Sequence, residues 1–211
     1  MKLILTDANI VVLASNYNPS IVSKDWILEK GIITENPTNF AHTPGFSHFE
    51  SENYILTVSE NRLLARVRKI NDLNVADLPD IVHKYVGSLP ETPYTAIGFN
   101  YKWIIHPEKQ EKNIAGLFKD VFLNQKHKIK FTHAIGNANY TLGGIVYSMY
   151  EEFRFKANIE FNEEGLFSFN YHLSLDLTKP RHEQLYNAIL KHGKTYEHAN
   201  NMVKEIMEVV S

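Results

Sequence analysis

The stretch that decides the fold is residues 140–177, YTLGGIVYSMYEEFRFKANIEFNEEGLFSFNYHLSLDL. Its second part alternates between apolar and mostly polar side chains, which is typical of a strand with one buried face and one solvated face. The apolar side of that strand holds Phe167, Phe169, Tyr171, Leu173, Leu175 and Leu177. We therefore expect two long strands, at residues 140–161 and 166–177, joined by a turn that begins with Asn162 and ends with Gly165.

Further strands and helices are expected on both sides of this hairpin. Apolar runs and two-residue alternation predict strands at residues 8–14, 46–50, 54–58, 62–68, 94–105 and 127–133. Apolar residues at three- and four-residue spacing predict helices at residues 24–30, 75–86, 108–122 and 181–210. Residues 34–45 contain two prolines and two asparagines without any period, which predicts an ordered loop.

Together these elements predict an α+β fold with a large, mostly antiparallel, twisted sheet of about seven to nine strands. The helices should pack on one side of the sheet, and the C-terminal helical segment, residues 181–210, should be long. Gly193 then marks either a close contact on one helix or a break between two. We expect a single domain over residues 1–211, with two merged halves, 1–90 and 91–211, as the alternative, because residues 89–93 (LPETP) have the composition of a linker.

The composition limits the classes of site and partner. The formal net charge of −2 over 211 residues gives no global attraction to nucleic acid or to an anionic membrane. The chain has no cysteine, which excludes disulfides, thiolate zinc sites and cysteine nucleophiles. It has neither a signal-peptide core nor a run of 18 apolar residues, so we expect a cytoplasmic protein without a membrane partner.

One part of the sequence resembles a known family. Residues 16–27, NYNPSIVSKDWI, follow an apolar strand and precede Gly31, where a short helix should end. Together with the segment FNYH at residues 169–172, this stretch is similar to a family of uncharacterised prokaryotic proteins that open with a strand, an Asn-Pro-Ser turn and a short helix. The resemblance implies a compact α+β domain, and it implies no activity.

The histidines and carboxylates of the chain are the residues from which a catalytic or metal-binding motif could be built. The ten histidines include no His-x-His or His-Glu-x-x-His spacing, so we expect no metal and no cofactor. Glu151 and Glu152 are adjacent in an expected strand and should point to opposite faces, so they should not act together in acid and base catalysis. An enzyme with an unrecognised site is still one hypothesis, with His172, Asn170 and Asp176 on the polar face of the last strand as its candidates.

Basic residues form two groups on expected strands. The first group is Arg62, Arg66 and Arg68, and the second is Lys126, Lys128 and Lys130. Such stripes can follow a phosphate backbone, and they can equally keep exposed strands soluble and unpaired. A nucleic-acid-binding module is therefore a second hypothesis.

The sequence favours interaction over catalysis as the function. It lacks catalytic motifs, 12% of its residues are aromatic, and many of its tyrosines are expected at the surface, where aromatic side chains mark interfaces. We expect a subunit or adaptor that binds another protein, or a second copy of itself, through the exposed sheet face and the C-terminal helix. Nucleic-acid binding and an enzyme site near His172 are the alternatives.

Overall fold

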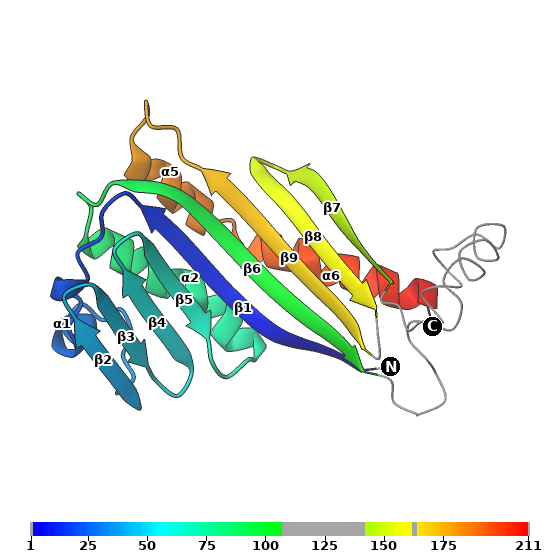
Figure 1. The fold of residues 1–211 in the computed structure, drawn as a ribbon, viewed down its shortest axis with the longest axis horizontal. Helices are drawn as coiled ribbons and strands as arrows, with labels where there is room; N and C mark the ends of the chain where they lie inside the picture. Colours follow the sequence, from blue (N-terminus) through cyan, green and yellow to red (C-terminus); the bar gives the residue numbers. More distant parts are fainter. Residues whose placement is uncertain (1, 107–141, 162–163, 211) are drawn as a thin grey trace.

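A nine-stranded antiparallel sheet dominates the part of the chain that the computed structural model describes, residues 2–106, 142–161 and 164–210 (Figure 1). Its strands are β1 (Lys2–Ala14), β2 (Asn39–Thr43), β3 (Phe46–Glu50), β4 (Tyr54–Ser59), β5 (Arg62–Val67), β6 (Tyr94–His106), β7 (Leu142–Tyr150), β8 (Phe153–Phe161) and β9 (Gly165–Ser174). Their order across the sheet is β2-β3-β4-β5-β1-β6-β9-β8-β7.

The helices pack against one face of the sheet, which confirms the expected α+β fold (Figure 1). They are the 3-10 turn η1 (Pro19–Ile21), α1 (Lys24–Glu29), α2 (Asp72–Ser88), α5 (Arg181–Ile189) and α6 (His192–Val210). Helix α2 contacts β1 and β5, α5 contacts β6, and α6 contacts β6 and β9. None of the described helices is both long and apolar enough to cross a membrane.

The described elements of the two halves of the sheet follow the same order. In each half a long strand comes first, a meander of strands returns beside it, and a helix then crosses the back: β1, β3 to β5 and α2 in one half, and β6, β7 to β9 and α5 in the other. The two long strands pair with each other at the centre of the sheet, from Lys2 opposite His106 to Ala14 opposite Tyr94. The sheet is therefore continuous across both halves.

The core lies between the sheet and the helices. Beneath α6 it is strongly aromatic, with Tyr101 and Trp103 of β6 and Tyr171 of β9 all 2% exposed or less. The hydroxyl of Tyr101 donates to the carbonyl oxygen of His192 at 3.2 Å and lies 2.9 Å from Oγ1 of Thr195. The apolar stripe of α6 therefore packs on the protein's own sheet.

The prediction of one long strand at residues 140–161 is wrong. The chain folds back at Glu151 and Glu152, so that Tyr150 pairs with Phe153 and two strands, β7 and β8, take its place. Glu151 has a φ of 49°, a left-handed conformation that non-glycine residues adopt at a cost. Lys191, in the break between α5 and α6, lies 3.1 Å from a carboxylate oxygen of Glu151 and 2.5 Å from one of Glu152. Both carboxylates therefore meet one cation instead of pointing to opposite faces.

Other boundaries also differ from the expectation. Strand β1 begins at Lys2 and not at residue 8, and β9 ends at Ser174 and not at residue 177. Residues 39–43 of the expected loop form the edge strand β2. Helix α2 begins earlier, because the side chain of Asn71 accepts a hydrogen bond from the backbone N–H of Asn74 at 2.8 Å and caps it. The C-terminal segment is two helices, and the break falls at residues 190–191, before Gly193. The expected helix at 108–122 and strand at 127–133 lie outside the described residues.

Candidate functional site

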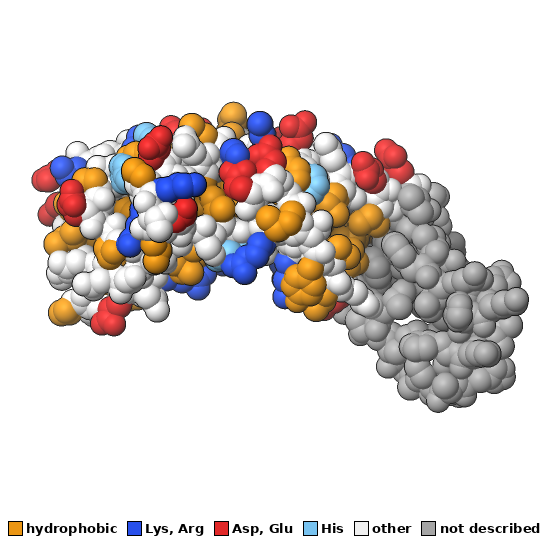
Figure 2. All heavy atoms as spheres, turned by 90° about the horizontal axis from the view of Figure 1, so that it is seen from above, with side chains coloured by type: hydrophobic (Ala, Val, Ile, Leu, Met, Phe, Trp, Pro, Cys, Tyr) orange, Lys and Arg blue, Asp and Glu red, His pale blue; other side chains and the backbone are white. Residues whose placement is uncertain are grey.

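The sheet face opposite the helices, here termed the bare face, is the candidate site. In Figure 1 it is turned toward the viewer, with α2, α5 and α6 behind it. Figure 2 views the molecule from above, with the bare face along the lower edge, and this edge is hollowed, with Lys and Arg side chains gathered in it. The bare face is thus a concave surface formed by strands far apart in the sequence.

An asparagine row, Asn9, Asn100 and Asn170, crosses the centre of the bare face. The three residues sit directly opposite one another on β1, β6 and β9. Asn170 Nδ2 donates to Asn100 Oδ1 at 2.7 Å, and Asn100 Nδ2 donates to Asn9 Oδ1 at 2.8 Å. Asn9 Nδ2 donates in turn to Asp7 Oδ2 at 3.0 Å. The row is therefore a directional chain of hydrogen bonds that ends on a carboxylate.

Cations flank the asparagine row at both ends. Arg66 on β5 is opposite Asn9, and its Nε donates to Asp7 Oδ1 at 2.8 Å. Lys156 on β8 is opposite Asn170. A hollow of about 320 Å³ lies along the row, lined by Asp7, Asn100, Tyr101, Lys102, Lys156, Asn158, Ser168, Phe169 and Asn170. The hollow offers amide groups and two ammonium groups to a ligand.

The charged side chains of the described strands lie on the bare face, and basic residues outnumber carboxylates there. The described strands contribute six basic residues to it, Lys2, Arg62, Arg66, Lys102, Arg154 and Lys156, against three carboxylates, Asp7, Glu50 and Glu160. The chain as a whole has a net charge of −2, so a face at +3 leaves −5 for the rest. Among the described residues, no carboxylate forms an ion pair with Lys102, Arg154 or Lys156.

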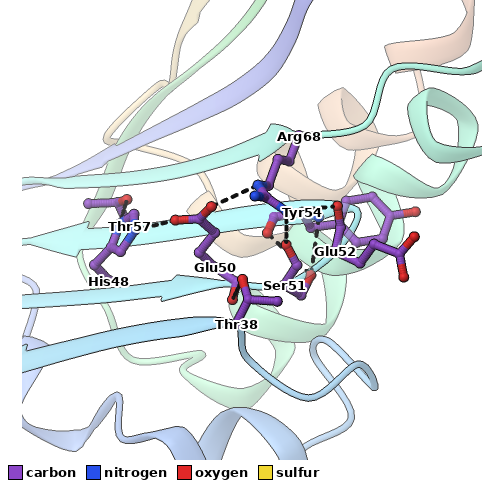
Figure 3. A network of polar contacts seen from close by, with 8 residues as sticks. All are labelled: Thr38, His48, Glu50, Ser51, Glu52, Tyr54, Thr57 and Arg68. Atoms are coloured by element: carbon purple, nitrogen blue, oxygen red, sulfur yellow. Dashed lines mark hydrogen bonds and ion pairs between the residues drawn. The ribbon is translucent and has the colours of Figure 1, made fainter.

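The basic residues proposed from the sequence are only partly available to a ligand. Arg66 is engaged by Asp7, and Arg68 Nε lies 2.7 Å from Glu50 Oε1 (Figure 3). Arg68 also donates to the carbonyl oxygens of residues 51 and 52 at 3.3 and 3.5 Å. Arg62 is exposed on the bare face, whereas Lys126, Lys128 and Lys130 lie outside the described residues. Lys102, Arg154 and Lys156, which the sequence did not single out, are the better candidates.

The proposed enzyme residues have separate roles. Asn170 belongs to the asparagine row, and His172 lies two residues along the same face, with Nε2 3.1 Å from Ser174 Oγ. Burial, and then the charge of Arg154, lower the pKa of His172 below its ordinary value. Asp176 follows the end of β9, where its Oδ1 accepts hydrogen bonds from the backbone N–H and the hydroxyl of Thr178. The carboxylate thus closes a turn and makes no hydrogen bond to His172.

A second hollow lies on the helix side of the molecule. It measures about 270 Å³ and includes Glu35, Asp77 and Asp80 in its lining. Glu35 accepts hydrogen bonds from the backbone and side chain of Asn53 at 3.0 and 2.6 Å, which ties the carboxylate to the β3–β4 turn. The described residues contain no group of three or more histidine, aspartate and glutamate side chains placed to hold a metal ion.

Comparison with models of known protein families and with curated proteins gives no match.

The sequence did not reveal the asparagine row. Alternation placed Asn170 on the polar side of its strand, but only the strand register brings the three amides together over separations of 91 and 70 residues. The only signal of the row in the sequence was an asparagine within each of three strands.

Proposed function

We propose that the protein is a binding module that holds a nucleic acid on its bare face. The observation that carries this proposal is the charge distribution: a concave face at +3 on a chain of net charge −2. Phosphate contacts supply most of the affinity in nucleic-acid binding, and they need basic side chains that are not already paired. Within the described residues, Lys102, Arg154 and Lys156 form no ion pair, and Arg154 donates only to a hydroxyl, that of Ser174, at 3.2 Å.

The asparagine row supplies the second kind of contact. Amide groups can both donate to and accept from base edges and sugars. Arg66 and Lys156 lie at opposite ends of the row, four strand spacings or about 19 Å apart. A nucleic acid that follows the row can therefore meet the amides and, at the β8 end, Lys156, while Arg66 at the other end is held by Asp7.

The adaptor hypothesis was based on two observations, and one of them, the expectation of many tyrosines at the surface, does not hold for the described residues. Six of the ten described tyrosines are buried, Tyr17, Tyr54, Tyr85, Tyr94, Tyr101 and Tyr171. Tyr147 alone among the described tyrosines counts as an exposed large side chain, at 72%. The apolar stripe of α6 is also covered by the sheet, so the bare face is the better of the two surfaces that the hypothesis named.

The experiment is a binding titration with fluorescently labelled single-stranded and duplex oligonucleotides, read by anisotropy at 50 mM salt. The test variant replaces Lys102, Arg154 and Lys156 by Ala. The matched control replaces three exposed lysines away from the bare face by Ala: Lys24 of α1, Lys30 directly after α1, and Lys84 of α2. It removes the same total charge as the test variant.

We expect wild type and control to bind alike and the test variant to bind more weakly. Absence of wild-type binding to both oligonucleotides contradicts the proposal. An equal loss in the control contradicts it as well, because net charge, and not the bare face, would then decide the affinity.

A further inference from the structure

Within the described residues, strand β7 is an edge of the sheet without the usual protection. It has nine residues, LGGIVYSMY, and none of them is charged. Four of the nine exposed large hydrophobic side chains of the described residues are on it: Ile145, Val146, Tyr147 and Met149, which are 49% to 72% exposed. Natural sheets usually protect an edge by a short strand, charges, proline or a bulge, and β7 has none of these.

The opposite edge shows the contrast within the same sheet. Strand β2 has five residues, and His42 on it is hydrogen-bonded through Nε2 to the carbonyl oxygen of Pro19 at 3.1 Å. The chain just before it is also tied down, because the backbone N–H of Thr38 donates to the carbonyl oxygen of Glu50 at 2.7 Å. A short edge held by neighbouring segments is a poor template for another strand, whereas β7 is long and apolar.

We propose that β7 pairs with β7 of a second copy of this chain, antiparallel and centred on Val146. In this register all nine residues find a partner, and the pairs fit by size. On the bare face, Tyr147 lies opposite Ile145 of the partner copy, and Met149 lies opposite Gly143. On the other face, Ser148 lies opposite Gly144, and Val146 meets its own counterpart on the two-fold axis.

Charge does not oppose this pairing. Since β7 carries no ionisable side chain with a charge at neutral pH, no like charges meet across the axis. The nearest basic residues are Arg154 and Lys156 on β8, and the backbones of the two β8 strands of the pair are three strand spacings or about 14 Å apart, beyond the screening length of about 8 Å at physiological salt. The ammonium group of Lys156 lies over the Tyr147 ring of its own β7, 5.7 Å from the ring centroid, where a cation–π contact stabilises it. The axis is perpendicular to the sheet, so both bare faces point to the same side. The pairing does not depend on the nucleic-acid proposal.

The first test is the mass of the full chain in solution, by light scattering during size exclusion. We expect about twice the chain mass of 24.3 kDa, and the mass of one chain for the variant Ile145→Lys, which places two ammonium groups in the paired strands. Tyr147→Lys is the second variant and should act in the same way. A wild-type protein of single-chain mass overturns the proposal, whether β7 is free or is covered by other residues of the same chain. A dimer that both variants leave intact overturns it too.

The second test uses the absence of cysteine from the chain. Residues directly opposite in an antiparallel pair have Cα atoms about 4.5 to 5.5 Å apart, within disulfide range, so Val146→Cys should cross-link to itself under mild oxidation. Ser148→Cys is the matched control, because its two copies would lie about 13 Å apart. Gly144→Cys has room for its side chain and should cross-link only when mixed with Ser148→Cys.

The cross-linking results decide the register as well as the pairing. A disulfide with Val146→Cys and none with Ser148→Cys alone supports the symmetric pair centred on residue 146. Equal cross-linking of both, or cross-linking of neither, overturns it.

Discussion

His192 should make the fold sensitive to mild acid. It is the first residue of α6, its side chain is 2% exposed, and its Nε2 has no hydrogen-bond partner. Its ring packs against Phe99 and Tyr101, with ring centroids 5.4 and 5.7 Å away. Burial lowers the pKa of His192 to about 4, because the charged imidazolium would lose its hydration there.

The size of the effect follows from the difference between the folded and unfolded pKa. The unfolded chain binds a proton at this residue below a pH of about 6.5, whereas the folded protein binds it only below about 4. Stability therefore falls as the pH drops from about 6.5 to about 4, and this residue accounts for a loss of about 3 kcal/mol over the whole window. Between pH 7.5 and pH 5 the expected share is about 2 kcal/mol.

The assay is urea unfolding at pH 7.5 and pH 5, followed by tryptophan fluorescence. The variants are His192→Leu and His192→Phe, which keep an apolar side chain in the site and remove the titration. The quantity compared is the difference in the free energy of unfolding between the two pH values, so that a change in packing cancels. We expect this difference to be about 2 kcal/mol smaller in both variants than in wild type. An equal pH dependence in all three proteins would refute a neutral, buried His192.

Three further predictions concern contacts that hold the sheet together. Asn100→Ala removes the middle of the asparagine row and should cost about 1 to 3 kcal/mol in urea unfolding, since a donor and an acceptor lose their partner; an unchanged free energy would mean that the row is not formed in solution. Tyr101→Phe removes a buried hydroxyl with two partners and should lower the free energy of unfolding by about 1 to 2 kcal/mol in the same assay. An unchanged free energy of unfolding would mean that α6 does not hold His192 and Thr195 against Tyr101. Lys191→Met should cost less than about 1 kcal/mol, because exposed ion pairs contribute little, yet hydrogen exchange at Glu151 and Glu152 should become faster; unchanged exchange would show that the turn does not need the lysine.

The sequence predicted the strands and helices whose signals are local. Alternation identified the apolar face of β9, and apolar runs and two-residue alternation identified the strands β3, β4, β5 and β6. The turn at Glu151 and Glu152 gave no such signal, because it contains no glycine, asparagine or proline. Lys191, some 40 residues later, contacts both carboxylates, and a contact of that range cannot be read from the residues of the turn.

The candidate site could be predicted only in fragments, for the same reason. The sequence assigned Asn170 to a polar strand face and Arg66 to a basic stripe, and both lie on the bare face. It could not show that Asp7 engages Arg66, or that Lys102 and Lys156 border one hollow, because these pairs depend on the order of strands in the sheet. Strand order is set by packing over the whole chain, so it cannot be predicted from the residues of one strand.

The salt dependence of nucleic-acid binding tests the central proposal most directly. If four bare-face cations without an ion pair among the described residues, Arg62, Lys102, Arg154 and Lys156, contact phosphates, binding of duplex DNA should weaken roughly 150-fold between 50 and 200 mM salt. Removal of Lys102, Arg154 and Lys156 should reduce that change to roughly fourfold, because each lost contact lowers the logarithmic slope by about 0.9. A slope that is the same in wild type and variant would contradict binding through the bare face.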